Sequence, residues 1–289
     1  MSNFLRQYEL TVGDGENSTV IEASEERTLR ITFDITHEWG GNRSLANIAV
    51  YGFSRATEGR IFKQYDKITL SAGYVDSIGL IFSGEIKNVV KERNGPERIT
   101  RIFALSDSTA RENSFIAETA GPGATVIDII NRCGTALGLP VVIDDGDFSG
   151  DPAYARGKVL LGDPVAIMRG LSEVHGFSFT LESGRCRVLK DGAALSNAPI
   201  IIGQENGMIG SPEITELGVN VSVNLTSKIR LGQQIEIDSR TPQVSISSVI
   251  YQNIETTVDV GVYTVQEIVH TGDSHGDNWS TKLTGWRFG

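Results

Sequence analysis

The feature that most constrains the fold of this chain is a repeated alternation of apolar and polar side chains. In one early run, Leu29, Ile31, Phe33 and Ile35 recur at every second position, which places them on one face of a β-strand. Asn94-Gly95-Pro96 is a turn signal between two further strand-like runs. The 32 glycines against 8 prolines also suit short strands joined by tight turns. The sequence therefore predicts a mainly β chain.

The N-terminal part of the chain predicts a meander of short strands. Its strand-like runs are Tyr8–Val12, Arg27–Ile35, Asn47–Ser54, Ile61–Tyr74, Leu80–Val90 and Arg98–Leu105. Because the last two runs flank the turn at Asn94, we expect them to form a β-hairpin.

Two helices are predicted in the middle of the chain. The first begins after Thr125, an N-cap residue with Asp128 three positions later, and it stops at Gly138. Asp163-Pro164 begins the second helix, which ends at Gly176. The first helix is followed by the strand-like run Val141–Ile143, and the second by Phe177–Leu181. A turn connects this second run to a further strand-like run, Arg185–Leu189. We expect a small α+β module here.

The β pattern resumes after this module and ends in the clearest hairpin of the chain. Val262–His270 and Trp279–Trp286 bracket a polar loop, Thr271–Asn278. Earlier runs in this part are Ile200–Ile202, Ile214–Leu217, Val219–Leu225, Gln234–Ile237 and Val244–Ile250. The chain has 289 residues, which is enough for two or three domains. The predicted fold class is mainly β with an α+β insertion. Two β-barrel or sandwich domains, residues 1–107 and 191–289, flank the α+β module of residues 108–190.

The charge of the chain makes a nucleic-acid-binding function a poor first hypothesis. The net charge is -10 and the pI is near 5.0, so the mean field repels phosphate backbones. A local cluster of Arg55, Arg60, Lys63 and Lys67 is interpreted as a solvated strand edge. The first residues lack the pattern of a signal peptide, and no run approaches the length of a membrane span. These observations predict synthesis in a cytoplasm without membrane insertion.

No sequence motif predicts catalysis or a cofactor. There is neither a phosphate-binding loop nor a G-x-S-x-G elbow. Cys133 and Cys186 have no metal-ligand spacing, and we expect buried, reduced thiols. Asp145–Gly150 resembles the first half of a calcium loop, but Arg156 stands where the bidentate glutamate should be. A solvated acidic turn is the preferred interpretation.

The four histidines offer one alternative metal site. His270 and His275 flank Asp273 and Asp277, and these four side chains could supply imidazole and carboxylate ligands. Their spacing fits no standard zinc site, and a polar hairpin tip with glycine turns explains the segment without an ion. We therefore predict no metal site.

Four stretches, in order and over nearly the whole chain, resemble the baseplate hub proteins of bacteriophage tails. They comprise Asn47–Ser54 with Asp66–Tyr74 and Ile81–Ile86; Gly176–Phe179 with the turn at Gly184; Gly207–Glu213 with Gly218–Val221 and Leu231–Ile235; and Gly261–Val265 with His270–Trp279. The chain departs from the family pattern at Val223–Ser227, where a usual proline turn is missing.

The resemblance implies a structural role rather than an enzymatic one. It implies a homotrimeric ring in which two barrels per subunit give pseudo-sixfold symmetry, joining a sixfold tail tube to a threefold central spike. The implied partners are the tail tube protein, the spike protein, other baseplate proteins, and DNA that passes through a channel without specific binding. The implied location is the virion, at the tail baseplate, with a contractile tail favoured.

Candidate family-motif or interface residues are chosen from these stretches and from the C-terminus. They are Gly73, Gly84, Gly210, Pro212, His270, Gly272, Asp273, Gly276, Trp279, Trp286 and Phe288. Trp286 and Phe288 are unusual for a free tail, and we expect them to dock in a core or a partner groove.

Three alternative functions stay open from the sequence. A tail-associated cell-wall hydrolase would clear peptidoglycan, although no extra length is present for a lytic domain. A glycan-binding tail module would need exposed aromatic platforms, and the chain has only three tryptophans. The third alternative is a type VI secretion spike component. Such proteins share the ancestry of the hub, and their sequences are hard to distinguish from those of phage hubs.

Overall fold

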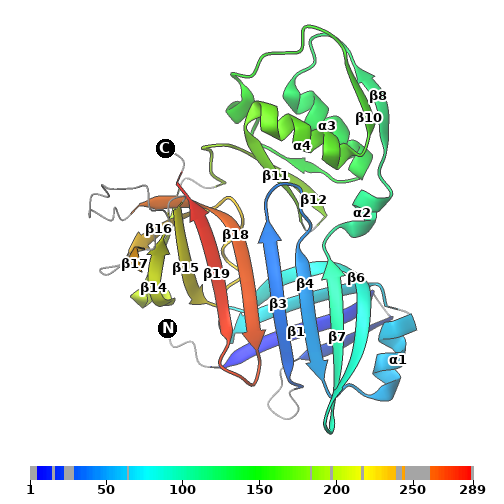
Figure 1. Ribbon diagram of the computed structural model, residues 1–289, viewed down its shortest axis with the longest axis vertical. Helices are drawn as coiled ribbons and strands as arrows, with labels where there is room; N and C mark the ends of the chain where they lie inside the picture. The colour runs from blue at the N-terminus through cyan, green and yellow to red at the C-terminus, as the bar shows by residue number, and fades with distance from the viewer. Residues whose placement is uncertain are drawn as a thin grey trace. The chain divides into compact units, whose positions relative to one another are not determined.

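The computed structural model of the chain comprises two compact units, drawn in Figure 1. Unit 1 consists of Met1–His37, Leu45–Ala104 and Ala194–Gly289, and unit 2 of Glu38–Ser44 and Leu105–Ala193. The structure describes residues 5–14, 17–22, 29–63, 65–182, 184–195, 198–215, 218–238, 243–244 and 261–287. The predicted three-part division with boundaries at 107 and 190 stays a prediction.

Unit 1 is built on one sheet that contains strands from both ends of the chain. The N-terminal strands are β1 (Arg6–Asp14), β2 (Asn17–Glu22), β3 (Ile31–Glu38), β4 (Leu45–Tyr51), β5 (Lys67–Tyr74), β6 (Gly79–Asn94) and β7 (Glu97–Leu105). The C-terminal strands are β13 (Ile200–Gly203), β14 (Met208–Ile214), β15 (Gly218–Asn224), β16 (Gln234–Asp238), β17 (Gln243–Val244), β18 (Val262–Asp273) and β19 (Trp279–Trp286), with a 3₁₀ turn η2 at Gln204–Asn206.

The sheet of unit 1 is 14-stranded and mostly antiparallel. Its main path runs β17-β14-β15-β19-β18-β3-β4-β7-β6-β5-β1-β2, while β16 pairs with both β13 and β18. The described strands form no closed barrel. The mainly β fold with a few helices is therefore confirmed, whereas the barrel form of the two β regions is not observed in the described residues.

β3 and β18 lie next to each other and join the two β regions, as Figure 1 shows for the blue and orange strands. The alternating pattern of β3 buries Ile31, Phe33 and Ile35, as its period of two predicts. The apolar core around them also contains Leu225 and Trp279 from the C-terminal part of the chain. The two β regions therefore share a core.

The two clearest hairpins are confirmed by the pairing of the strands. β6 and β7 are neighbours in the sheet, and Gly95 between them has a φ of 58°. β18 and β19 pair antiparallel from Thr264 opposite Trp286 to Gly272 opposite Trp279. Of the strand predicted at Val244–Ile250, only the first residue lies within the described residues, at the end of β17.

One helix of unit 1 corrects the sequence interpretation. Arg55–Lys63 forms helix α1, whereas the pattern from Ile61 onward predicts a strand. The hydroxyl of Ser54 accepts a hydrogen bond from the backbone N–H of Thr57 at 3.1 Å, and this caps the first turn. Ile61, near the C-terminal end of the helix, is buried in the core of unit 1.

The basic cluster is also placed differently from the prediction. Arg55, Arg60 and Lys63 lie on α1 and not on a strand edge, while Lys67 begins β5. The same helix carries Glu58, whose carboxylate lies 3.9 Å from the Lys91 ammonium on β6. The helix was missed because a short helix that packs on a sheet is stabilised mainly by that packing. A capping residue and one buried apolar residue are then enough to form it, and they leave little pattern in the sequence.

Unit 2 contains the predicted α+β module. Its elements are α2 (Ser108–Glu112), β8 (Ile116–Ala120), α3 (Val126–Leu137), β9 (Val141–Val142), η1 (Asp145–Phe148), β10 (Lys158–Gly162), α4 (Pro164–His175), β11 (Phe177–Glu182) and β12 (Arg185–Lys190). β8 and β10 form a two-stranded sheet, and β11, β12 and β9 form a three-stranded one.

The helices α3 and α4 begin and end where the sequence predicts. Thr125 and Asp128 form a reciprocal capping box at the start of α3, and Gly138 ends it in the left-handed conformation. Asp163 caps α4, with Pro164 in its first turn, and Gly176 ends it in the same way. The apolar faces of both helices pack in one core with residues of β8, β10, β11 and β12. None of the described helices is long and apolar enough to cross a membrane.

Candidate functional site

The loop between β18 and β19 is fastened to the N-terminal strands of unit 1. The Asp273 carboxylate accepts two hydrogen bonds from the Arg30 guanidinium, at 3.1 and 2.7 Å. This contact is the largest cause that holds the pKa of Asp273 below its ordinary value. The Ser274 hydroxyl accepts a hydrogen bond from the Ile31 N–H at 3.0 Å, and Arg6 donates to three backbone carbonyls of the loop. The predicted polar hairpin tip is thus part of a junction between the two β regions.

Trp279 is the apolar centre of this junction. Its indole N–H donates to the backbone carbonyl of Gly73 at 3.0 Å, across 206 positions of sequence. Its ring meets Phe33 edge to face at a centroid distance of 5.3 Å, and the Arg6 guanidinium lies 5.7 Å from the ring centroid. The structure therefore brings together two predicted residues, Gly73 and Trp279, from opposite ends of the chain.

The glycines of the junction leave room for close neighbours. A Cβ at Gly272 would overlap the Phe33 ring, and a Cβ at Gly276 would overlap the Asp273 carboxylate. At Gly73 a Cβ would overlap the carbonyl of Ser77. These three predicted positions therefore act in packing, because each lets a ring, a carboxylate or a backbone approach.

His270 is buried in β18 and faces a second buried histidine. Its Nδ1 lies 2.9 Å from the Thr281 hydroxyl, and its ring centroid lies 5.6 Å from that of His37. The Nε2 of His37 lies 2.9 Å from the carbonyl oxygen of Ile81. Burial, and to a smaller extent the proximity of His37, lower the pKa of His270 to about 3. His270 is therefore neutral and structural in the folded chain at pH 7.

The carboxylates on either side of the acidic turn Asp145–Gly150 have protein partners. In unit 2, Asp144 caps the 3₁₀ turn η1 by accepting from the Gly146 N–H at 2.9 Å. The Asp151 carboxylate binds the Lys190 ammonium at 2.8 Å and lies 3.3 Å from His175, and these contacts lower its pKa. Within the described residues, no group of three His, Cys, Asp or Glu side chains could hold a metal ion.

The two cysteines are buried, free thiols, as predicted. Burial raises the pKa of Cys133 on α3 to about 11 and that of Cys186 on β12 to about 12. Because the thiolate is the reactive form of cysteine, these groups are poor nucleophiles at neutral pH.

The remaining predicted residues lie elsewhere and are not brought to the junction. Gly84 on β6 is opposite Ile68. Gly210 has a φ of 72° where β14 shifts register against β15, and Pro212, two residues later, is buried. Trp286, at the end of β19, is 41% exposed, so it is not docked in the core of the chain. Phe288 lies outside the described residues.

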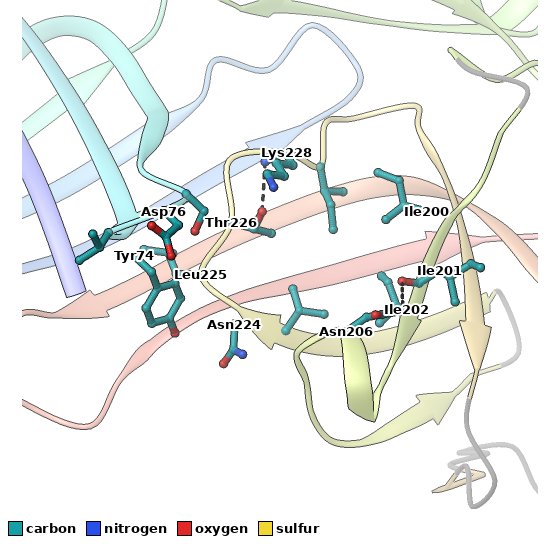
Figure 2. A pocket seen from close by; sticks show the side chains of 14 residues that line it. Tyr74, Asp76, Ile200, Ile201, Ile202, Asn206, Asn224, Leu225, Thr226 and Lys228 are labelled. Carbon is teal, nitrogen blue, oxygen red and sulfur yellow. Dashed lines mark hydrogen bonds between the residues drawn. The ribbon is translucent and has the colours of Figure 1, made fainter. Parts of the chain in front are cut away.

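Sequence reasoning missed a groove on unit 1, shown in Figure 2. The groove has a volume of about 310 Å³ and lies between the turn after β5 and the strands β13 and β15. Tyr74 and Asp76 lie on one side, and Ile200, Ile201 and Ile202 on the other. It could not be found from sequence spacing, because the two sides are more than a hundred residues apart.

Comparisons with known proteins agree with the resemblance in the sequence. A family model described as baseplate hub gp41 matches residues 41–255. No curated protein matches the chain.

Solved structures share the fold over nearly the whole chain. The 43 kDa tail protein of prophage MuSo2 from Shewanella oneidensis has a TM-score of 0.62 at 9% identity, covering 98% of this chain and 97% of that one. A tail protein from Neisseria meningitidis has a TM-score of 0.59 at 11% identity, with the same coverage. The E. coli c3393 protein, described as a type VI secretion component similar to the T4 tail proteins gp27 and gp5, has a TM-score of 0.59 at 8% identity, covering 97% of this chain and 77% of that one.

Proposed function

Because this chain belongs to the baseplate hub gp41 family, we propose that it forms a homotrimeric ring that joins the sixfold tail tube of a phage to its threefold central spike. The match over residues 41–255 carries this proposal, and it makes the chain a structural protein of a phage tail. The proposed partners are the tube protein, the spike protein and other baseplate proteins.

The sheet of unit 1 supports a mechanical role. Strands from both ends of the chain are joined at β3 and β18, and the core runs through the junction. A ring subunit under load needs this kind of continuity, because hydrogen-bonded strands resist separation better than two β regions joined only by a linker. The Asp273 carboxylate and the Trp279 indole N–H, two polar groups of the junction, make bonds within the chain.

The proposed ring encloses a channel for DNA. The net charge of -10 supports passage rather than binding, since an acidic wall repels phosphate groups. A structure of the assembled ring tests this point. Carboxylates mainly on the outer wall, with a basic lumen, would remove the support.

The mass of the purified protein in solution, measured by light scattering over a range of concentrations, tests the ring. Three copies of 31.3 kDa give about 94 kDa, and we expect this species. A mass near 31 kDa at every concentration would contradict the homotrimer.

Two alternative functions are separated by direct measurements. A cell-wall hydrolase would clear peptidoglycan in a zymogram, and we expect no clearing. A type VI spike component is the description printed for the E. coli c3393 protein. Co-purification with a phage tail tube protein, rather than with secretion-system proteins, is the result expected for a hub.

A further inference from the structure

The hairpin of β6 and β7 in unit 1 continues beyond its neighbouring strand β5. β5 pairs with β6 only from Gly79 to Glu85, so the later part of β6 has β7 as its described neighbour. All residues from Lys91 to Arg98 are exposed. Helix α1 lies beside this part of β6, as Figure 1 shows, and the Lys91 ammonium is 3.9 Å from the carboxylate of Glu58 on that helix.

The charged side chains of this hairpin are divided between its two faces. A two-residue turn joins β6 to β7, and this places Arg93 directly opposite Arg98. Since side chains alternate along a strand, Lys91 shares the face of these two arginines, whereas Glu92 and Glu97 lie on the other face. One face of the hairpin is therefore basic.

Helix α1 adds an exposed arginine beside the basic face. The backbone N–H of Gly52, three residues before Arg55, donates a hydrogen bond to the carbonyl of Arg98 at 2.9 Å. We call the side chains of Arg55, Lys91, Arg93 and Arg98 the basic patch. All four residues are exposed, and within the part of the chain that the structure describes its three arginines form no ion pair.

The basic patch is an exception in an acidic chain. Residues 52–101 contain nine lysines and arginines against six aspartates and glutamates, whereas the whole chain has 26 against 36. Two arginines directly opposite each other in a hairpin repel and lower its stability. Positive charge that is kept at this cost on an exposed hairpin indicates a surface that meets negative charge.

We propose that the basic patch binds an acidic segment of a different protein. Three of its four cations are arginines, and the planar arginine fork matches a carboxylate with two parallel hydrogen bonds. Charges are screened beyond about 8 Å at physiological salt, so a narrow segment meets the patch without approaching the acidic remainder of the chain. A whole second copy would bring its own net charge of -10 against that remainder. The inference goes beyond the proposed ring and does not depend on the homotrimer.

Nucleic acid fits the basic patch less well than an acidic polypeptide. Proteins that bind duplex DNA through its backbone make about 6 to 10 phosphate contacts. The patch has four cations, and Lys91 already lies beside the Glu58 carboxylate. Glu92 and Glu97 on the other face of the hairpin would also repel a phosphate backbone that passes along it. The patch therefore suits a few carboxylates rather than a dense row of phosphates.

Binding of a fluorescein-labelled oligoglutamate peptide to the full chain, measured by fluorescence anisotropy, tests the proposal. We expect Arg93→Glu combined with Arg98→Glu to raise the dissociation constant about tenfold. This double variant keeps two like charges opposite each other, so its stability should match that of the wild type. Arg156→Glu combined with Arg230→Glu changes two exposed arginines outside the patch and gives the same net charge. This control should bind the peptide as the wild type does.

The outcomes distinguish the possible occupants of the patch. Peptide binding that is weakened in the patch variant and kept in the control supports the proposal. No binding to the wild type, or equal weakening in both double variants, overturns it. Tighter binding of the wild type to a duplex DNA of the same charge would assign the patch to nucleic acid and overturn it as well. A lower mass of the patch variant than of the wild type in light scattering would assign the patch to a second copy, and this also overturns the proposal.

A single neutral variant tests whether the patch is kept for binding or for stability. Arg98→Gln removes one charge of the opposing pair with Arg93, so we expect a higher midpoint of thermal unfolding together with weaker binding of the peptide. Circular dichroism follows the unfolding. A lower midpoint would show that Arg98 stabilises the hairpin, and it would contradict the inference that its charge is kept for a partner.

Discussion

The two units of this chain hold their parts together by contacts of very different sequence separation. In unit 1 the decisive contacts are distant, such as Trp279 with Gly73 and Arg30 with Asp273. In unit 2 the helices are specified locally, by Thr125 with Asp128 and by Asp163 with Val165. Local contacts form cheaply, whereas distant ones require closure of a long loop first. Unit 1 is therefore more vulnerable at single positions than unit 2.

The two units also differ in what they leave outside. The junction of unit 1 buries Phe33 and Trp279 and pairs Arg30 with Asp273, while strand β10 of unit 2 exposes the apolar side chains of Val159 and Leu161. Changes in the junction are therefore expected to alter stability, whereas changes at Val159 and Leu161 should leave it nearly unchanged.

Removing the centre of the junction gives the largest expected effect. Trp279→Ala leaves a cavity beside Phe33 and removes the bond to Gly73, and we expect a loss of about 3 to 5 kcal/mol in the free energy of unfolding. Urea unfolding followed by circular dichroism measures it. Trp279→Phe keeps most of the ring and should lose less. A loss below about 1 kcal/mol for the alanine variant would show that the junction does not hold unit 1 together.

Acid provides the second test of the junction. The folded-state pKa of His270 is about 3, below its ordinary value of 6.5, so between these values the unfolded chain binds a proton that the folded chain does not. Its contribution to stability is complete above pH 6.5 and is lost as the pH falls towards 3. From pH 7 to pH 5 we expect a loss of about 2 kcal/mol from this group.

The control for the acid test is His270→Gln, which keeps a polar side chain near Thr281 but cannot titrate. Urea unfolding at both pH values should show a smaller pH dependence in this variant than in the wild type. Equal pH dependence in the two proteins would exclude His270 as the acid-sensitive group.

A local contact in unit 2 should matter less. Thr125→Ala removes the hydroxyl that caps α3, and we expect a loss of about 1 kcal/mol. Thr135→Ala on the exposed side of the same helix is the control, expected within about 0.5 kcal/mol of the wild type. Thermal unfolding measures both variants. A loss from Thr125→Ala as large as that from Trp279→Ala would break the contrast between the units.

The smallest effect is expected at Val174, an apolar residue that is 78% exposed. Val174→Lys on α4 should change neither the free energy of unfolding, within about 0.5 kcal/mol, nor the mass in solution. Urea unfolding and light scattering test both statements. A measurable change in mass would show that Val174 takes part in assembly.

The same contrast explains how much of the fold the sequence predicts. Each of the helices α3 and α4 has a capping residue at its start and a glycine at its end, each of which is a local signal, and both helices were predicted correctly. The hairpins at Gly95 and at Thr271–Asn278 were also predicted, because a turn lies between two neighbouring runs. The helix α1 was missed, since Ile61 fits the strand pattern that follows it. The pairing of β3 with β18 has no local signal at all.

The candidate site was predictable only as a set of residues. Sequence reasoning selected Gly73, Asp273 and Trp279 one by one, and the structure places them at a common junction. The roles of these three residues depend on their contacts with Arg6, Arg30 and Phe33. The positions of those partners depend on the register of the sheet, which the sequence does not show. The exposure of Val159 and Leu161 could not be predicted, because these residues alternate with their neighbours as in any strand, and the sequence does not show which face of the strand is covered.

The order of the sheet has a consequence for synthesis of the protein. β3 is made early, but its neighbour β18 begins at Val262, after residues 39–261 have been translated. At ribosomal speeds this interval lasts on the order of 10 to 45 s. During it the edge of β3 lacks its final partner, and a nascent chain arrested before Val262 should be cut by protease near β3 more readily than the complete chain. The chain therefore emerges with an unfinished edge, and the completion of unit 1 waits for its last two strands.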